Sequence, residues 1–314
     1  MVDLSVRIGD VTLANPVMPA SGTFSYEVGN IIDINRLGAM VAKTISREPR
    51  WGNPTPRMAE TEAGIIQSIG LPGKGVRYFL DHMIPEYKKY TPPLVASISA
   101  ATAEDFAAMA RDVSVPEVDV IEVNISCPTR DPSGGNFALH TEHTRNVVSG
   151  IRAATDKPVW AKLSPNAGDL VGIAVGAEQG GADALVISNT FLSLKIDTDT
   201  FRPSLGNKLG GLVSPALKPI VLRMVYQCAK EVSIPIIGLG GVTKAEDVVE
   251  YMLAGASAVG VGYAAFRNPS ALTAIIDDLE KWCERKGIAR LSDLIGAMID
   301  EPPADTMDAA ARPL

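Results

Sequence analysis

Polar and reactive residues follow an apolar run near the middle of this chain. In the stretch VDVIEVNISCPT, residues 118–129, a strand-like segment ends in Asn124, Ser126 and Cys127. The C-terminal tip of a parallel strand is where α/β enzymes carry their active sites. Cys127, taken alone, fits a buried core residue as well as a catalyst. The glycine-rich segment RDPSGG, residues 130–135, is typical of a loop that closes over a ligand.

Polar or small residues also end the other predicted strands. They are Ser21 and Gly22, Lys43 and Thr44, Ser97 and Ser99, Lys162, Ser188 to Thr190, Gly240 and Gly241, and Gly262 and Tyr263. No histidine and no carboxylate cluster is among them, which argues against a metal site and a His-based triad. The glycines that end the last two strands predict a phosphate site made of backbone N–H groups, although plain tight turns would need the same residues.

Two lysines, Lys43 and Lys162, stand near the ends of predicted strands. Each fits a Schiff-base former, a charge partner for an anion, or a side chain that only extends to solvent. Together with a phosphate site, they favour an anionic cofactor or substrate. The pattern alone also permits Schiff-base aldolase chemistry.

Eight short apolar runs position these groups. They span residues 17–20, 38–44, 93–99, 118–126, 158–164, 182–190, 234–241 and 258–263. Helical periodicity lies between them, at residues 104–112, 142–153, 170–180, 215–231 and 244–254, and a further helix is expected at 275–286. Thr243 and Glu246 predict a capping box, and Gly255 predicts the end of that helix.

This alternation predicts an α/β fold of the (β/α)8 TIM-barrel type, with a doubly wound open sheet as the alternative. A short hairpin around Gly9 and Asp10 is expected before the barrel. Two long excursions, residues 46–90 and 191–213, leave from C-terminal strand ends and are predicted to be loops that cover the mouth. No linker or repeat divides the chain, so we expect a single domain over residues 1–314.

Composition excludes several classes of protein. The net charge of −7 and the lack of a basic run argue against nucleic-acid binding. The three cysteines lack the spacing of a zinc or iron–sulfur site and fit a reducing compartment. The first residues do not read as a signal peptide, and no apolar segment reaches membrane-spanning length. We therefore expect a cytoplasmic protein without a membrane partner.

A series of motifs resembles one enzyme family. The motifs include ASGTF, WGNPTPR, SIGLPG, NISCP, KLSPN, NKLGGL, IPIIGLGG, AGASAVGVG and FRNP. In this combination, over about residues 1 to 290, the chain closely resembles the catalytic subunit of class 1 dihydroorotate dehydrogenases, above all the class 1B type. The resemblance implies a barrel that holds FMN at its mouth and oxidises dihydroorotate to orotate in de novo pyrimidine synthesis.

The resemblance also implies a role for each matching residue. Cys127 would remove the C5 proton of dihydroorotate while the C6 hydride passes to flavin N5, and Lys162 would lie near flavin N1 and O2. Lys43 and Asn124 would bind substrate and flavin. Gln67, Asn189 and Thr190 would contact the substrate, and the backbone around Ser68, Ile69, Gly70 and Leu71 would hold its carboxylate. Gly240, Gly241, Gly262 and Tyr263 would hold the FMN phosphate, and Ser21, Gly22, Thr44, Ser97, Ser188 and Ser214 would line the rest of the flavin site.

Some positions depart from the family pattern. Gln67 and Thr129 replace two asparagines that contact substrate in the family, and Thr129 lacks the paired donor and acceptor of an amide. Ser97, Ser214 and Tyr263 replace the usual asparagine, glycine and threonine at the flavin. The alternative is therefore a paralogue with the same flavin chemistry on another dihydropyrimidine or cyclic amide. A flavin-binding subunit without activity is a further alternative.

Electrons need a route out of the flavin. Because the chain has neither iron–sulfur spacing nor a dinucleotide fingerprint, it does not by itself connect FMN to NAD. A partner subunit with FAD and an iron–sulfur cluster, which the class 1B resemblance implies, or a soluble acceptor such as fumarate would take them. The resemblance also implies a homodimer.

Overall fold

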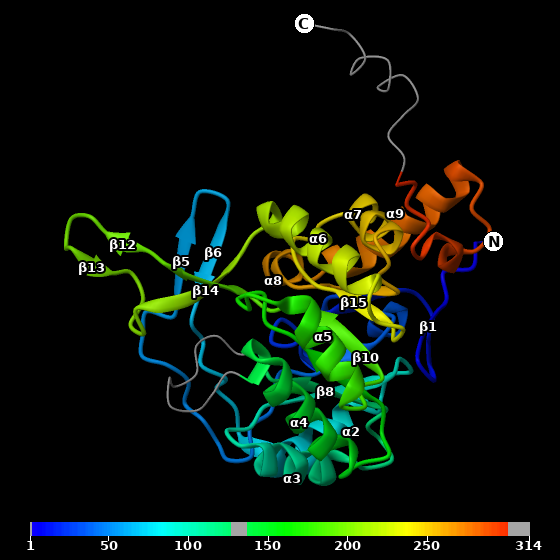
Figure 1. Cartoon of the computed structure of the whole chain (residues 1–314). Helices are drawn as coiled ribbons and strands as arrows, with labels where there is room; N and C mark the ends of the chain where they lie inside the picture. Colours follow the sequence, from blue (N-terminus) through cyan, green and yellow to red (C-terminus); the bar gives the residue numbers. More distant parts are fainter. Residues whose placement is uncertain (1, 127–136, 301–314) are drawn as a thin grey trace, which may run out of the picture.

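The computed structural model describes residues 2–126 and 137–300, and its centre is a parallel barrel (Figure 1). The barrel strands are β3 (Val17–Pro19), β4 (Met40–Val41), β7 (Leu94–Ile98), β8 (Val120–Asn124), β9 (Val159–Lys162), β10 (Ala184–Ile187), β15 (Ile236–Gly238) and β16 (Ala258–Val261). They form one eight-stranded sheet in the order β3-β16-β15-β10-β9-β8-β7-β4. The eight predicted strands all form, in the predicted order, and the (β/α)8 barrel is confirmed.

The barrel closes between its first two strands through a close approach at Gly38. The Gly38 N–H donates to the Val17 carbonyl at 2.9 Å. A Cβ atom on Gly38 would lie 2.1 Å from the Asn15 carbonyl oxygen. Asn15 fixes this corner, because its side chain accepts from the Val17 N–H at 3.0 Å and donates to the Arg36 carbonyl at 2.8 Å. Only glycine fits at this seam.

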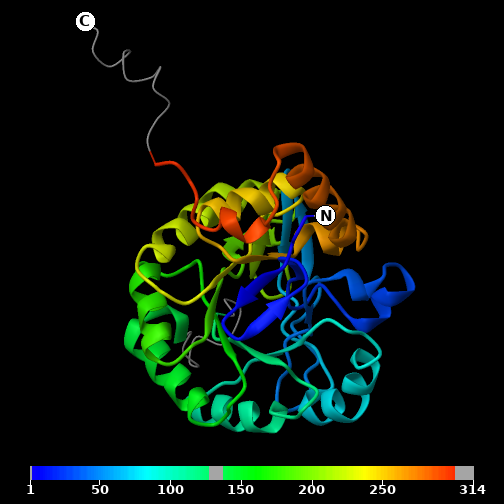
Figure 2. The same cartoon turned by 90° about the vertical axis from the view of Figure 1, so that its right-hand side faces the viewer.

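Helices surround the barrel as a ring (Figure 2). The longer ones are α3 (Ala103–Val113), α4 (Thr141–Arg152), α5 (Leu170–Gln179), α6 (Lys218–Ala229), α7 (Ala245–Leu253) and α9 (Ala271–Lys286). Shorter helical elements are α1 (Gly75–Tyr78), η3 (Phe79–Met83), α2 (Ile84–Tyr87) and α8 (Tyr263–Arg267), with single turns η1 (Tyr26–Asn30), η2 (Ile34–Arg36), η4 (Phe137–Leu139), η5 (Pro215–Leu217) and η6 (Leu291–Leu294). The long helices bury one apolar face each against the strands.

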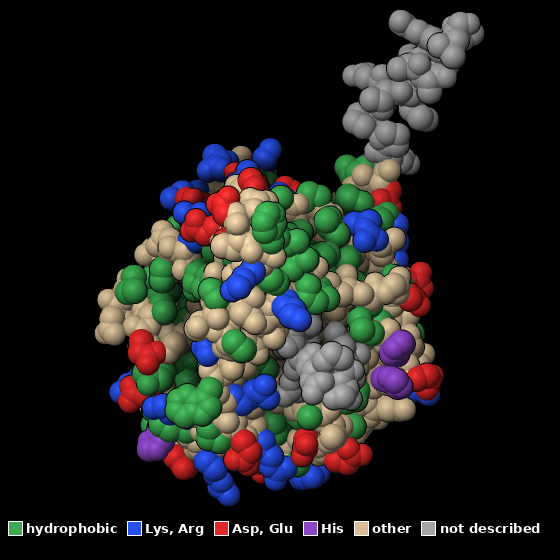
Figure 3. Space-filling model, turned by 90° about the vertical axis from the view of Figure 1, so that its left-hand side faces the viewer, with side chains coloured by type: hydrophobic (Ala, Val, Ile, Leu, Met, Phe, Trp, Pro, Cys, Tyr) green, Lys and Arg blue, Asp and Glu red, His purple; other side chains and the backbone are tan. Residues whose placement is uncertain are grey.

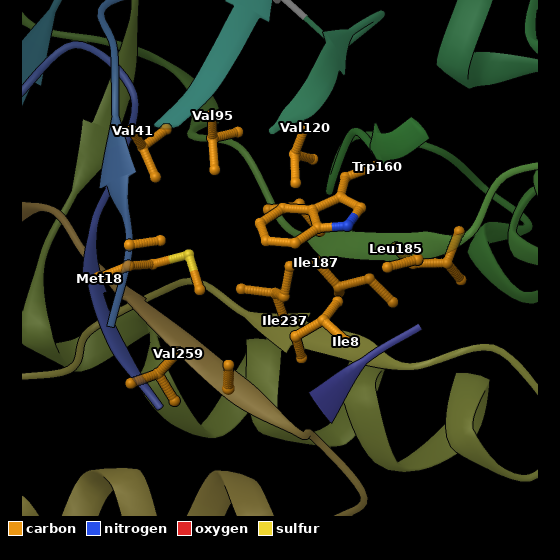
Figure 4. Close-up of a cluster of buried hydrophobic side chains, with 14 of the residues drawn as sticks. Ile8, Met18, Val41, Val95, Val120, Trp160, Leu185, Ile187, Ile237 and Val259 are labelled. Carbon is orange, nitrogen blue, oxygen red and sulfur yellow. The ribbon is translucent and has the colours of Figure 1, made fainter. Parts of the chain in front are cut away.

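The barrel interior is filled with side chains from every strand (Figure 4). Trp160 of β9 lies at its centre and is 1% exposed. The expected N-terminal hairpin forms from β1 (Val6–Ile8) and β2 (Val11–Leu13), and Ile8 belongs to the same buried cluster. The hairpin therefore covers the N-terminal end of the barrel, while the C-terminal end stays available for a ligand.

The two long excursions are more ordered than the sequence predicts. Strands β5 (Met58–Thr61) and β6 (Gly64–Gln67) come from the first, and β11 (Phe191–Leu194) and β14 (Leu209–Val213) from the second. They pair as one antiparallel sheet in the order β11-β14-β6-β5, which we call the cover sheet. A small ribbon, β12 (Ile196–Asp197) with β13 (Arg202–Pro203), extends from it. The expectation of loops was wrong here, because β6 of the first excursion and β14 of the second pair with each other although they are far apart in sequence.

The start of α7 also differs from the prediction. The helix begins at Ala245 with Lys244 as its N-cap, one residue later than a cap at Thr243 requires. The carboxylate that accepts from the Thr243 and Lys244 N–H groups therefore belongs to Asp247 and not to Glu246. Gly255 follows the helix in a left-handed conformation, as predicted. Within residues 2–126 and 137–300, no helix is long and apolar enough to cross a membrane.

Candidate active site

A deep cavity opens at the C-terminal end of the barrel, between the strand ends and the cover sheet. Residues of the barrel strands, of the cover sheet and of α8 all contribute to its lining. Its walls include many predicted site residues: Ser21, Gly22, Lys43, Thr44, Gln67, Ile69, Gly70, Leu71, Asn124, Lys162, Asn189, Thr190, Gly262 and Tyr263. Lys and Arg side chains lie among hydrophobic ones on this face of the molecule (Figure 3).

Lys162 brings a buried cation to the cavity wall. It ends β9, is 3% exposed, and its ammonium donates to the Ser21 hydroxyl at 3.0 Å. An ammonium has three N–H donors, and among the described residues only Ser21 accepts one of them in a hydrogen bond. The remaining donors suit an electron-rich or anionic ligand, since an unpaired buried cation is costly.

Lys43 follows β4 and lines the same cavity. Burial lowers the pKa of its ammonium below the ordinary 10.5, and the nearby charge of Arg57 lowers this pKa further. Arg57 is held by backbone oxygens, because it donates to the Trp51 carbonyl at 2.8 Å and to the Asn53 carbonyl at 2.5 Å. The cavity thus contains a second lysine, whose charged form is disfavoured and would be stabilised by an anionic ligand.

Asn124, Ser126 and Asn189 form a hydrogen-bonded group at the ends of β8 and β10. The Asn124 side-chain oxygen accepts from the Ser126 hydroxyl at 3.0 Å. Asn189 donates from its amide to the Ser126 hydroxyl oxygen at 2.9 Å and to the Asn124 side-chain oxygen at 3.4 Å. The Thr190 N–H donates to the Asn189 side-chain oxygen at 2.8 Å, so these amides hold one another in fixed orientations.

The segment after β6 presents backbone groups to the cavity. Gly70 and Leu71 both have a left-handed backbone, with φ of 77° and 54°. Such a conformation is strained for leucine, and backbone strain of this kind gathers at functional sites. Ser68 anchors the segment from behind, because its hydroxyl oxygen accepts from Asn53 at 2.8 Å and from Asn207 at 3.1 Å.

The side chain of Gln67 folds back onto this segment. Its oxygen accepts from the Ile69 N–H at 3.2 Å. Ile69 is one of the residues whose backbone is expected to hold the substrate carboxylate. In the structure this N–H already has an acceptor, and a ligand carboxylate has to compete with Gln67 for it.

Other expected site residues lie outside the cavity lining. Ser68, Ser97, Ser188, Ser214, Gly240 and Gly241 stand behind or beside the wall, whereas Leu239, Gly262 and Tyr263 form part of it. The Ser214 hydroxyl donates to the Ala63 carbonyl at 2.6 Å and links the cover sheet to η5. Cys127 and Thr129 lie outside the residues that the structure describes.

Sequence reasoning missed the apolar walls. Met58, Ile65 and Val213 of the cover sheet, and Phe266 of α8, line the cavity beside the polar groups. The places of Met58, Ile65 and Val213 on the wall depend on the pairing of β5, β6 and β14, which the sequence does not indicate. A ligand with apolar surface, polar edges and a negative charge therefore suits these walls.

Fold and site together define a (β/α)8-barrel enzyme with its catalytic cavity at the C-terminal mouth. The sequence model of the family described as dihydroorotate dehydrogenase matches residues 3–282. The chain belongs to the dihydroorotate dehydrogenase family.

Relatives of known name match almost the whole chain. The dihydroorotate dehydrogenase B (NAD(+)) catalytic subunit of Trichlorobacter lovleyi is 44% identical over 298 residues, which cover 94% of this chain and 98% of that protein. The subunit of the same name from Porphyromonas gingivalis is 44% identical over 305 residues, covering 96% and 99%. The crystal structure of DHODH from Eimeria tenella in complex with ferulenol has a TM-score of 0.77 at 23% identity, over 94% of this chain and 88% of that one, and supports the fold.

Proposed function

We propose that this chain oxidises dihydroorotate to orotate in pyrimidine synthesis and that its cofactor is FMN. The observation that carries the proposal is the family match over the whole barrel, together with a cavity whose walls contain most of the residues expected from that family. The family implies a flavin, and FMN is the flavin that a phosphate site after β15 and β16 would suit.

The cavity fits this cofactor on one structural observation in particular. Lys162 is a buried ammonium on the wall that donates to Ser21 alone among the described residues, and reduced flavin is an electron-rich group that a cation stabilises. Ser21, Gly22, Thr44 and Asn124 would hold the ring system, and the backbone at Gly262 and Tyr263, with Gly240 and Gly241 beside it, would hold the phosphate. When bound, FMN supplies the hydride acceptor.

The chain's own residues would orient the substrate and move its proton. Lys43 and the backbone of Ser68 to Leu71 would bind the carboxylate, and Asn124, Asn189 and Thr190 would hydrogen-bond the ring. Cys127 would take the C5 proton as a thiolate. The cover sheet would keep water out while this proton moves.

We further propose a partner subunit with FAD and an iron–sulfur cluster as the electron acceptor. The relatives named above are each called the catalytic subunit of an NAD(+)-dependent enzyme. A soluble acceptor such as fumarate is the alternative. The homodimer and the cytoplasmic location that we expect from the sequence stay predictions.

Gln67 supports a second candidate function. Because its side chain occupies the Ile69 N–H, the pocket would bind a carboxylate less readily than the family pattern implies. A paralogue that oxidises another dihydropyrimidine or cyclic amide, with the same flavin chemistry, fits this contact.

An anaerobic titration tests both candidates. The purified protein is loaded with FMN, and the flavin absorbance is followed while dihydroorotate or dihydrouracil is added. Rapid bleaching by dihydroorotate that is lost in Cys127→Ala supports the main proposal. Bleaching by dihydrouracil alone supports the paralogue. A protein that neither binds FMN nor is bleached contradicts both.

A further inference from the structure

A chain of buried hydrogen bonds stands behind the cavity wall. The Ser97 hydroxyl of β7 donates to the Glu122 carboxylate of β8 at 2.7 Å. The hydroxyls of Ser97 and Thr44 lie 2.9 Å apart, and the Asn124 amide donates to the Thr44 oxygen at 3.2 Å. All four residues are 0–6% exposed. Thr44 and Asn124 line the cavity, whereas Glu122 and Ser97 stand behind them.

The carboxylate sets the direction of the hydrogen bonds at Ser97 and Thr44. The Ser97 hydroxyl has a single proton, and it donates this proton to Glu122. Ser97 must then accept from Thr44, which uses the Thr44 proton. The Thr44 oxygen is therefore left as an acceptor, and it takes an N–H from Asn124. The direction of the hydrogen bonds from Ser97 to Thr44 therefore follows from the bond to Glu122.

The Asn124 amide faces the way that this direction requires, and Ser126 and Asn189 also hold it in that orientation. Its nitrogen lies toward Thr44, and its oxygen accepts from Ser126 and Asn189 on the other side. If Glu122 were replaced by a residue without an acceptor, the Ser97 and Thr44 hydroxyls could rotate, and the Thr44 proton could turn toward the cavity. The pattern that the wall presents to a ligand, an acceptor at Thr44 beside an N–H of Asn124, would then be lost.

Stability of the barrel gives no reason for a carboxylate at this place. Glu122 is 3% exposed inside a strand that is otherwise buried and apolar up to Asn124, and burying a charge is costly. Within the described residues its carboxylate takes part in none of the ion pairs, and its side-chain hydrogen bond goes to Ser97. What the carboxylate does supply is a fixed acceptor at the end of the chain.

We propose that Glu122 is a positioning residue: acting through Ser97, it holds the Thr44 hydroxyl as an acceptor toward FMN, beside the Asn124 amide that Ser126 and Asn189 hold in place. The inference rests on the proposed function, because it takes Asn124 and Thr44 as flavin contacts. To these two contacts the inference adds Glu122 and Ser97, which stand behind the wall. Ser97 would therefore act on the flavin through Thr44 and not by direct contact.

A double-mutant cycle tests this role with FMN as the probe. The dissociation constant of FMN is measured by flavin fluorescence on the apoprotein of the full chain, for Ser97→Ala, Glu122→Ala and the double variant. Each single change should weaken FMN binding about tenfold, as expected for a lost buried hydrogen bond. The double variant should bind no more weakly than the singles, because both changes break the same chain.

Two further variants separate positioning from plain stability. Ser99→Ala removes a hydroxyl of equal burial next to β7, which donates to the Asn124 backbone oxygen at 3.2 Å, and it should change FMN affinity less than twofold. Glu122→Gln keeps an acceptor of the same length and should recover FMN binding to within about threefold of the wild type, since an amide oxygen also accepts from Ser97. If Glu122→Ala does not fold, Ser97→Ala and Glu122→Gln carry the test.

The inference is overturned if folded Ser97→Ala and Glu122→Ala bind FMN as the wild type does, or if their effects add in the double variant. A wild-type protein that binds no FMN contradicts the proposed function instead. Melting temperatures of the apoproteins report folding independently, so the two failures are distinguishable.

Discussion

Lys43 and Lys162 are both cations on the cavity wall, but they are held differently. Lys162 is bound by the Ser21 hydroxyl and is almost fully buried. Lys43 lies nearer Arg57, and burial together with that positive charge lowers its pKa. A cation whose charged form is disfavoured gains most from an anionic ligand, so Lys43 is the residue whose titration should appear in binding data.

Binding of orotate, the product of the proposed reaction, should therefore weaken at alkaline pH. As pH rises through the lowered pKa of Lys43, which lies below 10.5, the ammonium loses its proton and its attraction for the carboxylate. Lys43→Gln should bind orotate roughly ten- to a hundredfold more weakly at neutral pH, which corresponds to a charged hydrogen bond of about 1.5–3 kcal/mol.

The measurement is orotate titration of the flavin spectrum across pH. The Lys43→Gln profile corrects for ionisation of orotate itself, and Lys286→Gln, an exposed lysine on α9, is the matched control. Parallel profiles for the wild type and Lys43→Gln would contradict the assignment.

Gln67 gives a second prediction at the scale of one residue. If its oxygen competes with the ligand carboxylate for the Ile69 N–H, Gln67→Ala should favour orotate over uracil, which lacks the carboxylate. The ratio of their affinities should rise about two- to tenfold, the range of one net hydrogen bond. Gln227→Ala on α6 is the control, and an unchanged ratio would exclude competition by Gln67.

The sequence indicates which residues reach the mouth, but not what stands behind them. Lys43, Asn124 and Lys162 follow from the rule that chemistry lies at the ends of parallel strands. Glu122 appears only as an interruption of an apolar run. Its neighbours Ser97 and Thr44 come from other strands, and their contacts depend on barrel geometry that spacing does not encode.

At the scale of elements, an ion cluster ties α6 to the start of α7. The Lys218 ammonium lies 2.7 Å from Asp247 and 2.8 Å from Glu250. Burial raises the pKa of the Asp247 carboxyl, but hydrogen bonds from Lys218 and Thr243 outweigh burial, and the pKa lies below its ordinary value of 3.8. This cluster holds the loop after β15, where a Cβ atom on Gly241 would touch Lys218.

Asp247→Asn should lower the free energy of unfolding by about 1–3 kcal/mol, since it leaves Lys218 and the capped N–H groups poorly paired. A carboxyl whose pKa is lowered by folding stabilises the fold above its unfolded value. The difference between wild type and variant is therefore complete above pH 3.8 and is lost as pH falls through the lower, folded pKa.

Urea unfolding of the two proteins at several pH values measures this difference. Asp278→Asn is the matched control, because its pair with Lys281 is exposed and such surface pairs contribute about 0–1 kcal/mol. A difference that persists unchanged below the folded pKa of Asp247 would contradict the role of its charge.

Elements with a strong local signal could be predicted, and elements completed by distant partners could not. The eight barrel strands are continuous apolar runs, as expected for strands buried on both faces. Strand β14 reads as a turn because it contains Gly210 and Gly211. A Cβ atom on Gly211 would lie 1.9 Å from the Thr190 hydroxyl oxygen, so close packing explains that glycine. The helical stretch 75–87 was missed because Pro85 interrupts it.

For the molecule as a whole, closure of the barrel depends on the seam at Gly38. Gly38→Ala would place a Cβ atom 2.1 Å from the Asn15 carbonyl oxygen and push β3 away from β4. We expect a loss of about 1–3 kcal/mol or more in the free energy of unfolding, the usual range for overpacking.

Gly150→Ala on α4 is the control, because nothing lies within 4 Å of the added Cβ atom. Replacing a glycine inside a helix should stabilise the protein by about 0.5–1 kcal/mol. Thermal melts of both variants test whether Gly38→Ala lowers the stability of the protein while Gly150→Ala raises it. A Gly38→Ala protein as stable as the wild type would show that the seam tolerates a side chain.

The cover sheet differs from the barrel in how it resists opening. Residues of β5 and β11 alternate between partly buried and exposed, whereas β7, β8 and β9 are buried throughout. Local unfolding therefore costs less free energy in the cover sheet, and its amide protons should exchange with deuterium well before those of the barrel. A ligand that touches Gln67 and Val213 would slow exchange in the cover sheet, so deuterium uptake there reports whether the cavity is filled.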